Sequence, residues 1–230
     1  MNLLLFLQVS VADTASADMA DEIRMSYWEL AMKGGWVMLP IILLSVIAVY
    51  IFFERFFAIK KAAQIDTNFM NRIRDYIHDG KVDNALTLCQ SYLNPTARMI
   101  EKGIQRIGRP LEDINSAIEN TGKLEIYKLE RGLPTLATVA GGAPMIGFLG
   151  TVMGMVRAFY DMSMAGSNID VSLLSNGIYT ALITTVAGLI VGIVAYFAYN
   201  VLVARVEKVV NKLEVNSTEF LDLLNEPVSR

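Results

Sequence analysis

The chain has 230 residues, of which 53% are hydrophobic, and a formal net charge of −3. Its mean hydropathy of +0.41 exceeds what is usual for a soluble domain and favours a membrane protein. The acidic balance gives no electrostatic basis for binding nucleic acid, and the single cysteine, Cys89, excludes an internal disulfide. No phosphate-binding glycine loop, metal-spaced Cys and His set or nucleophile–base pair is present, so we expect no enzyme, catalytic residue, cofactor or metal site.

Residues 1–33 form the first predicted segment, for which two interpretations are open. A short apolar run followed by Ala15-Ser16-Ala17 is compatible with a cleaved signal peptide. However, no Lys or Arg precedes that run, and Tyr27 and Trp28 lie among charged residues, as in a helix at the headgroup level of a membrane. We therefore favour an interfacial segment.

The first transmembrane helix is predicted over residues 34–57. Pro40 lies in its first turn, where a missing backbone N–H costs little. Glu54-Arg55 closes the apolar run, and Lys60-Lys61 follows after two phenylalanines, which together indicate an aromatic belt and a basic stop.

Residues 58–132 are predicted to form a helical domain outside the membrane. Apolar residues recur at helical spacing in four runs, Phe69 to Ile77, Val82 to Leu93, Met99 to Ile107 and Leu111 to Leu129. Asn94-Pro95 is expected to end the second run. The fourth run reaches Pro134, and its continuation into the next span is one of two possibilities that the sequence leaves open. Cys89 falls on an apolar face and is expected in the core, whereas His78, among charged neighbours, is expected at the surface.

The second and third transmembrane helices are predicted over residues 133–159 and 174–204, joined by a loop at 160–173. Within them, residues 133–156 and 172–204 contain no Asp, Glu, Lys, Arg or His. Each is long enough to cross about 30 Å of hydrocarbon, which takes about 20 helical residues. Both are rich in small residues, and those expected to pack helices closely are Pro144, Gly147, Gly150, Gly154, Gly188 and Gly192.

Threonines share the small-residue face of these two spans. Thr180, Thr184 and Gly188 follow one another at four-residue intervals, as do Gly147 and Thr151, so that they lie along one side of each helix. One interpretation is a tight helix pair, because small residues let helices approach closely in lipid. The other is a polar path lined by hydroxyls, each of which both donates and accepts a hydrogen bond.

Charge asymmetry predicts the orientation in the membrane. Of the 20 Lys and Arg residues, 13 lie between Glu54 and Gly132, and Arg205, Lys208 and Lys212 follow the third span. Because basic loops stay inside, the N-terminus and the 160–173 loop are expected in the periplasm, and the helical domain and the C-terminus in the cytoplasm.

Residues 205–230 are expected to continue the third span as a helix. Its apolar residues alternate three- and four-residue spacings, as in a helix with a packing seam, at Val206, Val210, Leu213, Phe220 and Leu224. Such a seam must pack against a partner, which from sequence is either the chain's own helical domain or a neighbouring subunit.

With these elements placed, the chain resembles the MotA/TolQ/ExbB proton-channel family, and within it the three-span ExbB/TolQ branch, from about Ser26 to the C-terminus. The run that carries the resemblance most specifically is Ala143-Pro144-Met145-Ile146-Gly147-Phe148-Leu149-Gly150-Thr151-Val152-Met153-Gly154-Met155. Supporting motifs are Gly34-Gly35-Trp36, Glu54-Arg55-Phe56-Phe57, Leu133-Pro134 and Tyr199-Asn200.

The resemblance implies an all-α membrane protein that assembles as a ring, a homo-pentamer around the single-span helices of an ExbD/TolR-like partner. That partner's membrane aspartate takes up and releases protons, and the pore threonines by motif match are Thr151 and Thr185, with Thr180 and Thr184 on the same helix. ExbB-like relatives can carry a Glu where this chain has Thr180. A scheme that needs that Glu does not apply here.

The leading functional hypothesis is an ExbB-like proton-channel subunit of the bacterial inner membrane, which couples the proton motive force to TonB-dependent transport across the outer membrane. The nearest alternative is a TolQ-like subunit of the Tol-Pal envelope system, with a TolA-like partner. From a different class, a passive helical scaffold in the bilayer is also open. Spans two and three contain no ionisable group, so conduction would require a carboxylate from a second protein.

Overall fold

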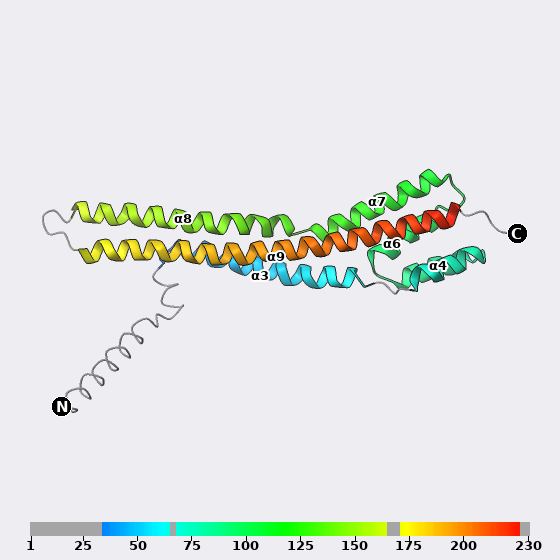
Figure 1. The fold of residues 1–230 in the computed structure, drawn as a ribbon, viewed down its shortest axis with the longest axis horizontal. Coiled ribbons are helices and arrows are strands. Elements are labelled where there is room, and N and C mark those ends of the chain that lie inside the picture. Colours follow the sequence, from blue (N-terminus) through cyan, green and yellow to red (C-terminus); the bar gives the residue numbers. More distant parts are fainter. Residues whose placement is uncertain (1–33, 65–67, 165–170, 226–230) are drawn as a thin grey trace, which may run out of the picture. The chain divides into compact units, whose positions relative to one another are not determined.

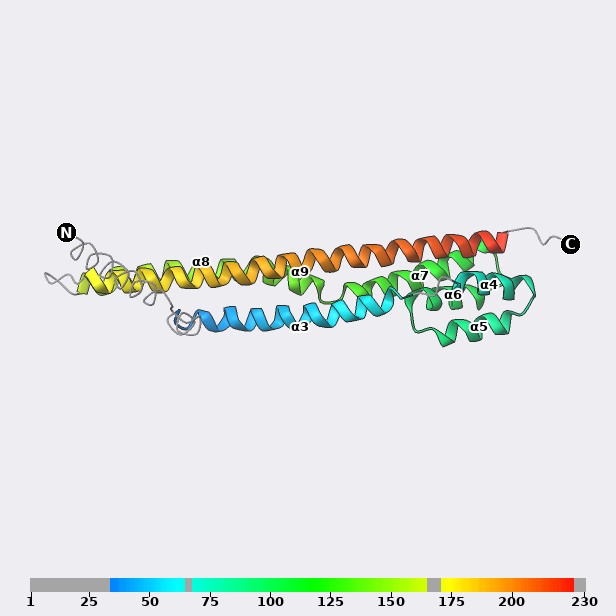
Figure 2. The ribbon, with the colours of Figure 1, turned by 60° about the horizontal axis from the view of Figure 1, so that its bottom comes forward.

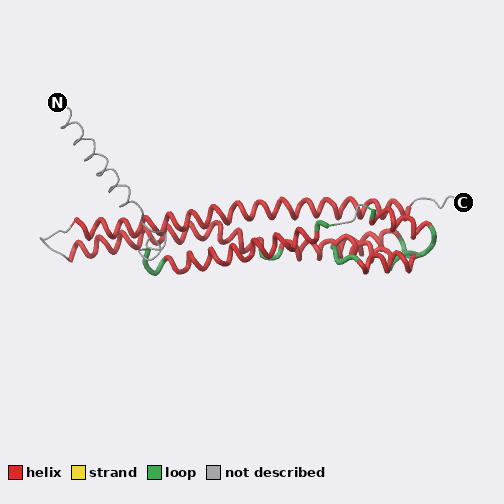
Figure 3. Tube along the Cα trace, turned by 90° about the horizontal axis from the view of Figure 1, so that it is seen from below, coloured by secondary structure: helices red, strands yellow, loops and turns green. Residues whose placement is uncertain are grey.

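A computed structural model describes residues 34–64, 68–164 and 171–225. Within these ranges every regular element is a helix, and no strand is present (Figure 3), which confirms the predicted all-α class. The helices, labelled in Figure 1, are α3 (Met38–Ala62), α4 (Phe69–His78), α5 (Val82–Ser91), α6 (Pro95–Ile104), α7 (Leu111–Glu130), α8 (Leu133–Met164) and α9 (Val171–Asn225). The signal-peptide and interfacial interpretations of residues 1–33 fall outside the described residues.

Three helical stretches are long and apolar enough to cross a membrane, in agreement with the number and order of the predicted spans. They are Met38–Ala62, Leu111–Met164 and Leu174–Asn225. The helix of the second span, α8, extends beyond the predicted end at residue 159 and continues to Met164, where this described range ends. Arg157 and Asp161 end the apolar pattern, but neither side chain breaks a helix.

The predicted run from residue 111 does not continue into the second span. Gly132 adopts a φ of +86°, a left-handed conformation that separates α7 from α8. The Arg55 side chain on α3 donates a hydrogen bond of 3.0 Å to the carbonyl oxygen of Lys128 in the last turn of α7. A glycine turn and an arginine on a neighbouring helix therefore end α7 here.

The chain divides into two compact units. The described part of the first comprises residues 34–43, 143–164 and 171–191, and that of the second comprises residues 44–64, 68–142 and 192–225. In the second unit, each of α4, α5 and α6 contacts the next helix along the chain (Figure 2). Their core includes the fully buried side chains of Phe69, Ile73, Ile100 and Ile118.

The α6 helix begins four residues before the predicted start. The Asn94 side chain accepts a hydrogen bond of 2.8 Å from the backbone N–H of Ala97, and Pro95 occupies the first helical position. An asparagine cap followed by proline is a strong helix start. The helix α5 has already ended at Ser91, three residues before the predicted stop, and Asn94-Pro95 instead begins α6.

The C-terminal part of α9 continues the third span without a break, as predicted, and packs on the chain's own domain. Phe220 is fully buried, and its ring lies so close to Gly103 that a Cβ there would be 2.6 Å from it. The buried row differs from the predicted one because Val209 and Leu223, rather than Val210 and Leu224, face inward. At Phe220 the seam is therefore covered by the same subunit.

Ion pairs connect the helices of the second unit. The Glu125 carboxylate on α7 is 95% buried and lies 3.0 Å from Arg98 of α6 and 2.6 Å from Lys128. Arg74 of α4 lies 3.1 Å from Glu219 of α9. A buried carboxylate is costly unless it is paired, and Arg98 provides that pairing between α6 and α7.

Cys89 is 1% exposed and His78 is exposed, as the sequence predicts. Burial, with a smaller contribution from Glu101, raises the pKa of the Cys89 thiol to about 12. We expect Cys89 to resist alkylation at pH 9 in the folded protein, because on the order of one thousandth of it is thiolate there, and to react fully after denaturation. Iodoacetamide labelling followed by mass spectrometry checks this.

The same shift has a consequence for stability. The folded state holds its thiol proton up to a higher pH than the unfolded state, so the free energy of unfolding falls as pH rises above the ordinary thiol pKa of 9.0. Replacing Cys89 by Ala should remove this part of the pH dependence. Rapid alkylation of the folded protein would contradict the buried assignment.

Candidate functional site

The first unit is built on a close pair of antiparallel helices, α8 and α9. A Cβ at Gly147 would lie 2.7 Å from the carbonyl oxygen of Thr184, and one at Gly154 would lie 2.7 Å from the Cβ of Ala181. One turn or more further along, Ala158 occupies the space beside Gly177. The two backbones are therefore in contact over several turns, which side chains larger than hydrogen would prevent.

Only some of the predicted packing residues lie at this contact between α8 and α9. Gly150 faces Thr184 and also Val37, just before α3, and Gly188 faces Gly147. Pro144 lies inside α8 and lines a groove, and Gly192 is buried in the second unit. At Gly141 a Cβ would meet no atom within 4 Å beyond the adjoining backbone of its own helix, so small residues in α8 do not all mark contacts.

Three threonine hydroxyls meet where the two helices touch. Thr151 of α8 is hydrogen-bonded to the hydroxyl of Thr185 on α9 and lies 3.1 Å from the carbonyl oxygen of Ala181. The Thr185 hydroxyl donates to the carbonyl oxygen of Gly147 at 3.1 Å. We call Thr151, Thr184 and Thr185 the threonine cluster.

The members of the threonine cluster differ in access. Thr184 is 2% exposed, and its hydroxyl lies 2.7 Å from its own helix carbonyl at Ala181 and 3.3 Å from that of Gly147. Thr151 and Thr185 are half-buried. Thr180 is also half-buried, but in the described chain no hydrogen bond joins it to the cluster. Of the four threonines predicted to line a proton path, Thr151, Thr184 and Thr185 thus lie together and Thr180 lies outside the cluster, while the role of these residues in a proton path stays a prediction.

Hydroxyl geometry leaves the cluster with more than one proton arrangement. Each threonine has one proton to donate and two lone pairs to accept with. When Thr185 donates to Gly147, the acceptors within reach of the Thr151 hydroxyl are the Thr185 hydroxyl, the Ala181 carbonyl oxygen and, at 3.4 Å, the Gly147 carbonyl oxygen. The cluster can thus reorient its hydrogen bonds, but neither helix supplies an ionisable group here that would carry a proton away.

An open groove of about 560 Å³ borders the cluster in the first unit. Its walls are apolar side chains of α8 and α9, and Thr185 is the one hydroxyl among them. The lining residues are Pro144, Met145, Phe148, Leu149, Val152, Thr185 and Leu189. Met145 is 73% exposed and Phe148 is 64% exposed. Such a groove fits the apolar side of another helix, with one polar group opposite Thr185.

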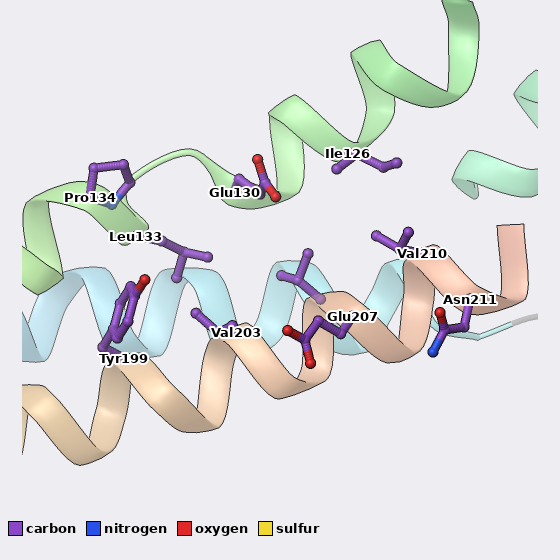
Figure 4. A pocket seen from close by; sticks show the side chains of 10 residues that line it. Ile126, Glu130, Leu133, Pro134, Tyr199, Val203, Glu207, Val210 and Asn211 are labelled. Carbon is purple, nitrogen blue, oxygen red and sulfur yellow. The ribbon is translucent and has the colours of Figure 1, made fainter. Parts of the chain in front are cut away.

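A second groove, of about 590 Å³, lies within the second unit where α7 gives way to α8. Figure 4 shows Glu130 from α7 and Glu207 from α9 among its lining side chains, with Tyr199 and Asn211. No pattern in the sequence indicates this groove, because its carboxylates come from helices that no spacing rule connects. Among the described residues, no group of His, Cys, Asp and Glu is arranged to hold a metal ion.

Comparison with known proteins gives a consistent match. Residues 92–215 match the model of the MotA/TolQ/ExbB proton channel family. The chain is 28% identical over 188 residues to a biopolymer transport protein ExbB homologue of Methanothermobacter thermautotrophicus, covering 81% of this chain and 66% of the relative. It is 34% identical over 189 residues to a biopolymer transport protein ExbB-like 1 of Synechocystis, covering 75% and 69%.

The Tol-Pal system protein TolQ of Haemophilus influenzae is 42% identical over a shorter stretch of 98 residues, 43% of this chain and 41% of that protein. The chain therefore spans about two thirds of the length of the ExbB-like relatives and less than half of this TolQ.

The close helix contact can be tested with two glycines of the same helix. Gly147→Ala should destabilise the α8–α9 pair by about 1–3 kcal/mol, because its Cβ would press on the backbone of Thr184 and Thr185. Gly141→Ala, where the space is open, should raise stability by about 0.5–1 kcal/mol through lower backbone entropy. Thermal unfolding of the purified variants measures both, and equal effects would argue against the contact.

Proposed function

Because this chain belongs to the MotA/TolQ/ExbB proton channel family, we propose that it is an ExbB-type subunit that conducts protons with an ExbD-like partner. In this proposal the complex lies in the inner membrane and couples the proton motive force to TonB-dependent transport across the outer membrane. The chain forms a homo-pentamer around the partner's single-span helices, with α8 and α9 toward the axis.

The observation that carries the proposal is the threonine cluster within an uncharged pair of helices. Hydroxyls can solvate a carboxyl group in either protonation state, but they do not carry a proton through hydrocarbon by themselves. The groove beside Thr185 is open, apolar and otherwise without a polar side chain. Both features suit a partner helix that brings one acid to the level of Thr151 and Thr185.

Thr151 and Thr185 are the residues we assign to the proton pathway. We assign Thr184 to helix packing, because its hydroxyl is buried against two carbonyl oxygens. Thr180, where relatives can carry Glu, offers only a hydroxyl, so the acid comes from the partner alone. Moving one charge through 100 mV is worth about 2.3 kcal/mol, so a few protons suffice to rotate the partner within the ring.

The orientation follows from the basic residues. The helical domain and the C-terminal part of α9, which contain most of the Lys and Arg, are placed in the cytoplasm, and the N-terminus in the periplasm. Protons then enter at the α8–α9 connection and leave toward the cytoplasmic domain.

The pathway assignment predicts that Thr151→Val and Thr185→Val each lower partner-dependent proton flux by about tenfold or more, since valine keeps the shape but removes the hydroxyl. Thr138→Val is the matched control, because Thr138 is exposed on the same helix and bonds only to its own turn at Pro134. Flux is measured in liposomes that contain the chain and a small aspartate-bearing partner.

Assembly of each variant is measured by native mass spectrometry, so that a loss of flux is separated from a loss of the complex. Full flux in both threonine variants would refute the pathway assignment. Flux through the chain without any partner would refute the requirement for an external acid. A complex that assembles but never conducts would favour the passive scaffold.

A TolQ-type role in envelope integrity is the second candidate, supported by the identity of 42% to a TolQ over 98 residues. Expression of this chain with its own ExbD- or TolR-like partner in bacteria that lack either ExbB or TolQ separates the two roles. We expect restored TonB-dependent uptake in the first strain and persistent detergent sensitivity in the second. The reverse pattern would assign the chain to the Tol-Pal system.

A further inference from the structure

Arg205 of α9 stacks on an aromatic ring at the end of α3. Its guanidinium carbon lies 4.2 Å from the centroid of the Phe56 ring, within the second unit. Arg205 is the first charged residue after the uncharged stretch at 172–204, and Phe56 follows the first charged residues of α3. Both side chains therefore lie where the uncharged part of their helix ends, and in a membrane-spanning helix that is the level of lipid headgroups.

The charges that follow on α9 are divided between two faces. Lys208 and Lys212 lie three and seven residues after Arg205 and share its face, whereas Glu207 and Glu214 lie on the opposite one. Both glutamates line grooves whose other wall is α7, and Glu207 is seen in one of them in Figure 4. The cations are thus kept apart from the carboxylates of the same helix.

Lys60 adds a fourth cation, one turn after Phe56 on the same face of α3. Lys60, Lys208 and Lys212 are exposed, and Arg205 is half-buried. In the described parts of the chain none of the four forms an ion pair, whereas Arg55 nearby is already bonded to Glu54 and to the Lys128 carbonyl. The four cations are therefore not neutralised by a carboxylate of the described chain and are available to a negatively charged group from outside it.

Exposed aromatic side chains adjoin these cations on the membrane side. Phe53 is 54% exposed and Phe57 is 63% exposed on α3. A ligand that fills this place therefore has an anionic end and an apolar body. A stacked guanidinium is well suited to a phosphate group, because its planar N–H donors bind two oxygens at once while the ring restrains it.

We propose that Arg205, Lys208 and Lys212 of α9, together with Lys60 of α3, bind the phosphate headgroup of an anionic membrane lipid. Its acyl chains lie along the exposed phenylalanines of α3. The site needs only that α3 and α9 cross the membrane, and it holds whether or not the chain conducts protons. Each cation near an anionic surface contributes enough to change affinity about fivefold.

The test uses the full-length chain in a neutral detergent, titrated with phosphatidylglycerol or phosphatidylcholine, with bound lipid counted by native mass spectrometry. The triple variant Lys60→Gln/Lys208→Gln/Lys212→Gln leaves the stack of Arg205 on Phe56 in place. The matched control, Lys81→Gln/Lys102→Gln/Lys123→Gln, removes the same charge from exposed lysines elsewhere in the second unit.

We expect the first variant to lose affinity for phosphatidylglycerol by about a hundredfold, with phosphatidylcholine binding and the control variant unchanged. Equal loss in the control would overturn the proposal, because net charge alone would then explain it. Unchanged binding in the first variant, or release of the lipid by millimolar inorganic phosphate, would also overturn it. If the triple variant does not fold, Lys208→Gln gives the same test with a fivefold effect.

Discussion

The contact between α8 and α9 at Gly147 is the constraint on which the candidate site depends. A hydrogen in place of a side chain brings the carbonyl oxygen of Gly147 within 3.1 Å of the Thr185 hydroxyl and lets that hydroxyl reach Thr151. A methyl group there would lie 2.7 Å from the Thr184 carbonyl oxygen and push the helices apart. The glycines therefore set the distance between the two helices, and the threonine hydroxyls form hydrogen bonds across that distance.

The site is polar without being charged, and this defines what it can contribute to proton transfer. Its hydroxyls are satisfied by one another and by backbone oxygens, so that these polar groups are paired where the two helices meet. Its hydroxyl protons can change acceptors, but the two uncharged stretches contain no Asp, Glu, Lys, Arg or His to take up or release a proton by ionising. An open apolar groove borders the cluster at Thr185, where that hydroxyl is the one polar side-chain group among the lining residues.

The α9 helix changes its surroundings along its length, and its sequence changes with them. Small residues and threonines pair with α8, Arg205 begins a cationic face on the α3 side, and Phe220 fills the core of the helical domain. Glutamates on the opposite face line the grooves against α7. The residue types along this one continuous helix therefore change with the helices that each part of it contacts.

The sequence by itself determined the features that belong to single segments. Hydropathy predicted three spans, and the residue list shows that 133–156 and 172–204 are uncharged. Hydropathy and charge content can be read from sequence because each is a sum over neighbouring residues. Helical periodicity placed Cys89 in the core, and one specific glycine and threonine run identified the family. Periodicity also placed Thr151 with Gly147, and Thr184 with Gly188, along one side of each helix, whereas Thr185 came only from the resemblance to the family.

Only the tertiary structure decided what meets across helices. It excluded Thr180 from the cluster and began α6 at Pro95. On α9 it buried Val209 instead of the predicted Val210. It also revealed the stack of Arg205 on Phe56 and the groove between Glu130 and Glu207. These features depend on how far each helix is rotated and shifted against its neighbour, and that is set by the packing of distant side chains rather than by local pattern.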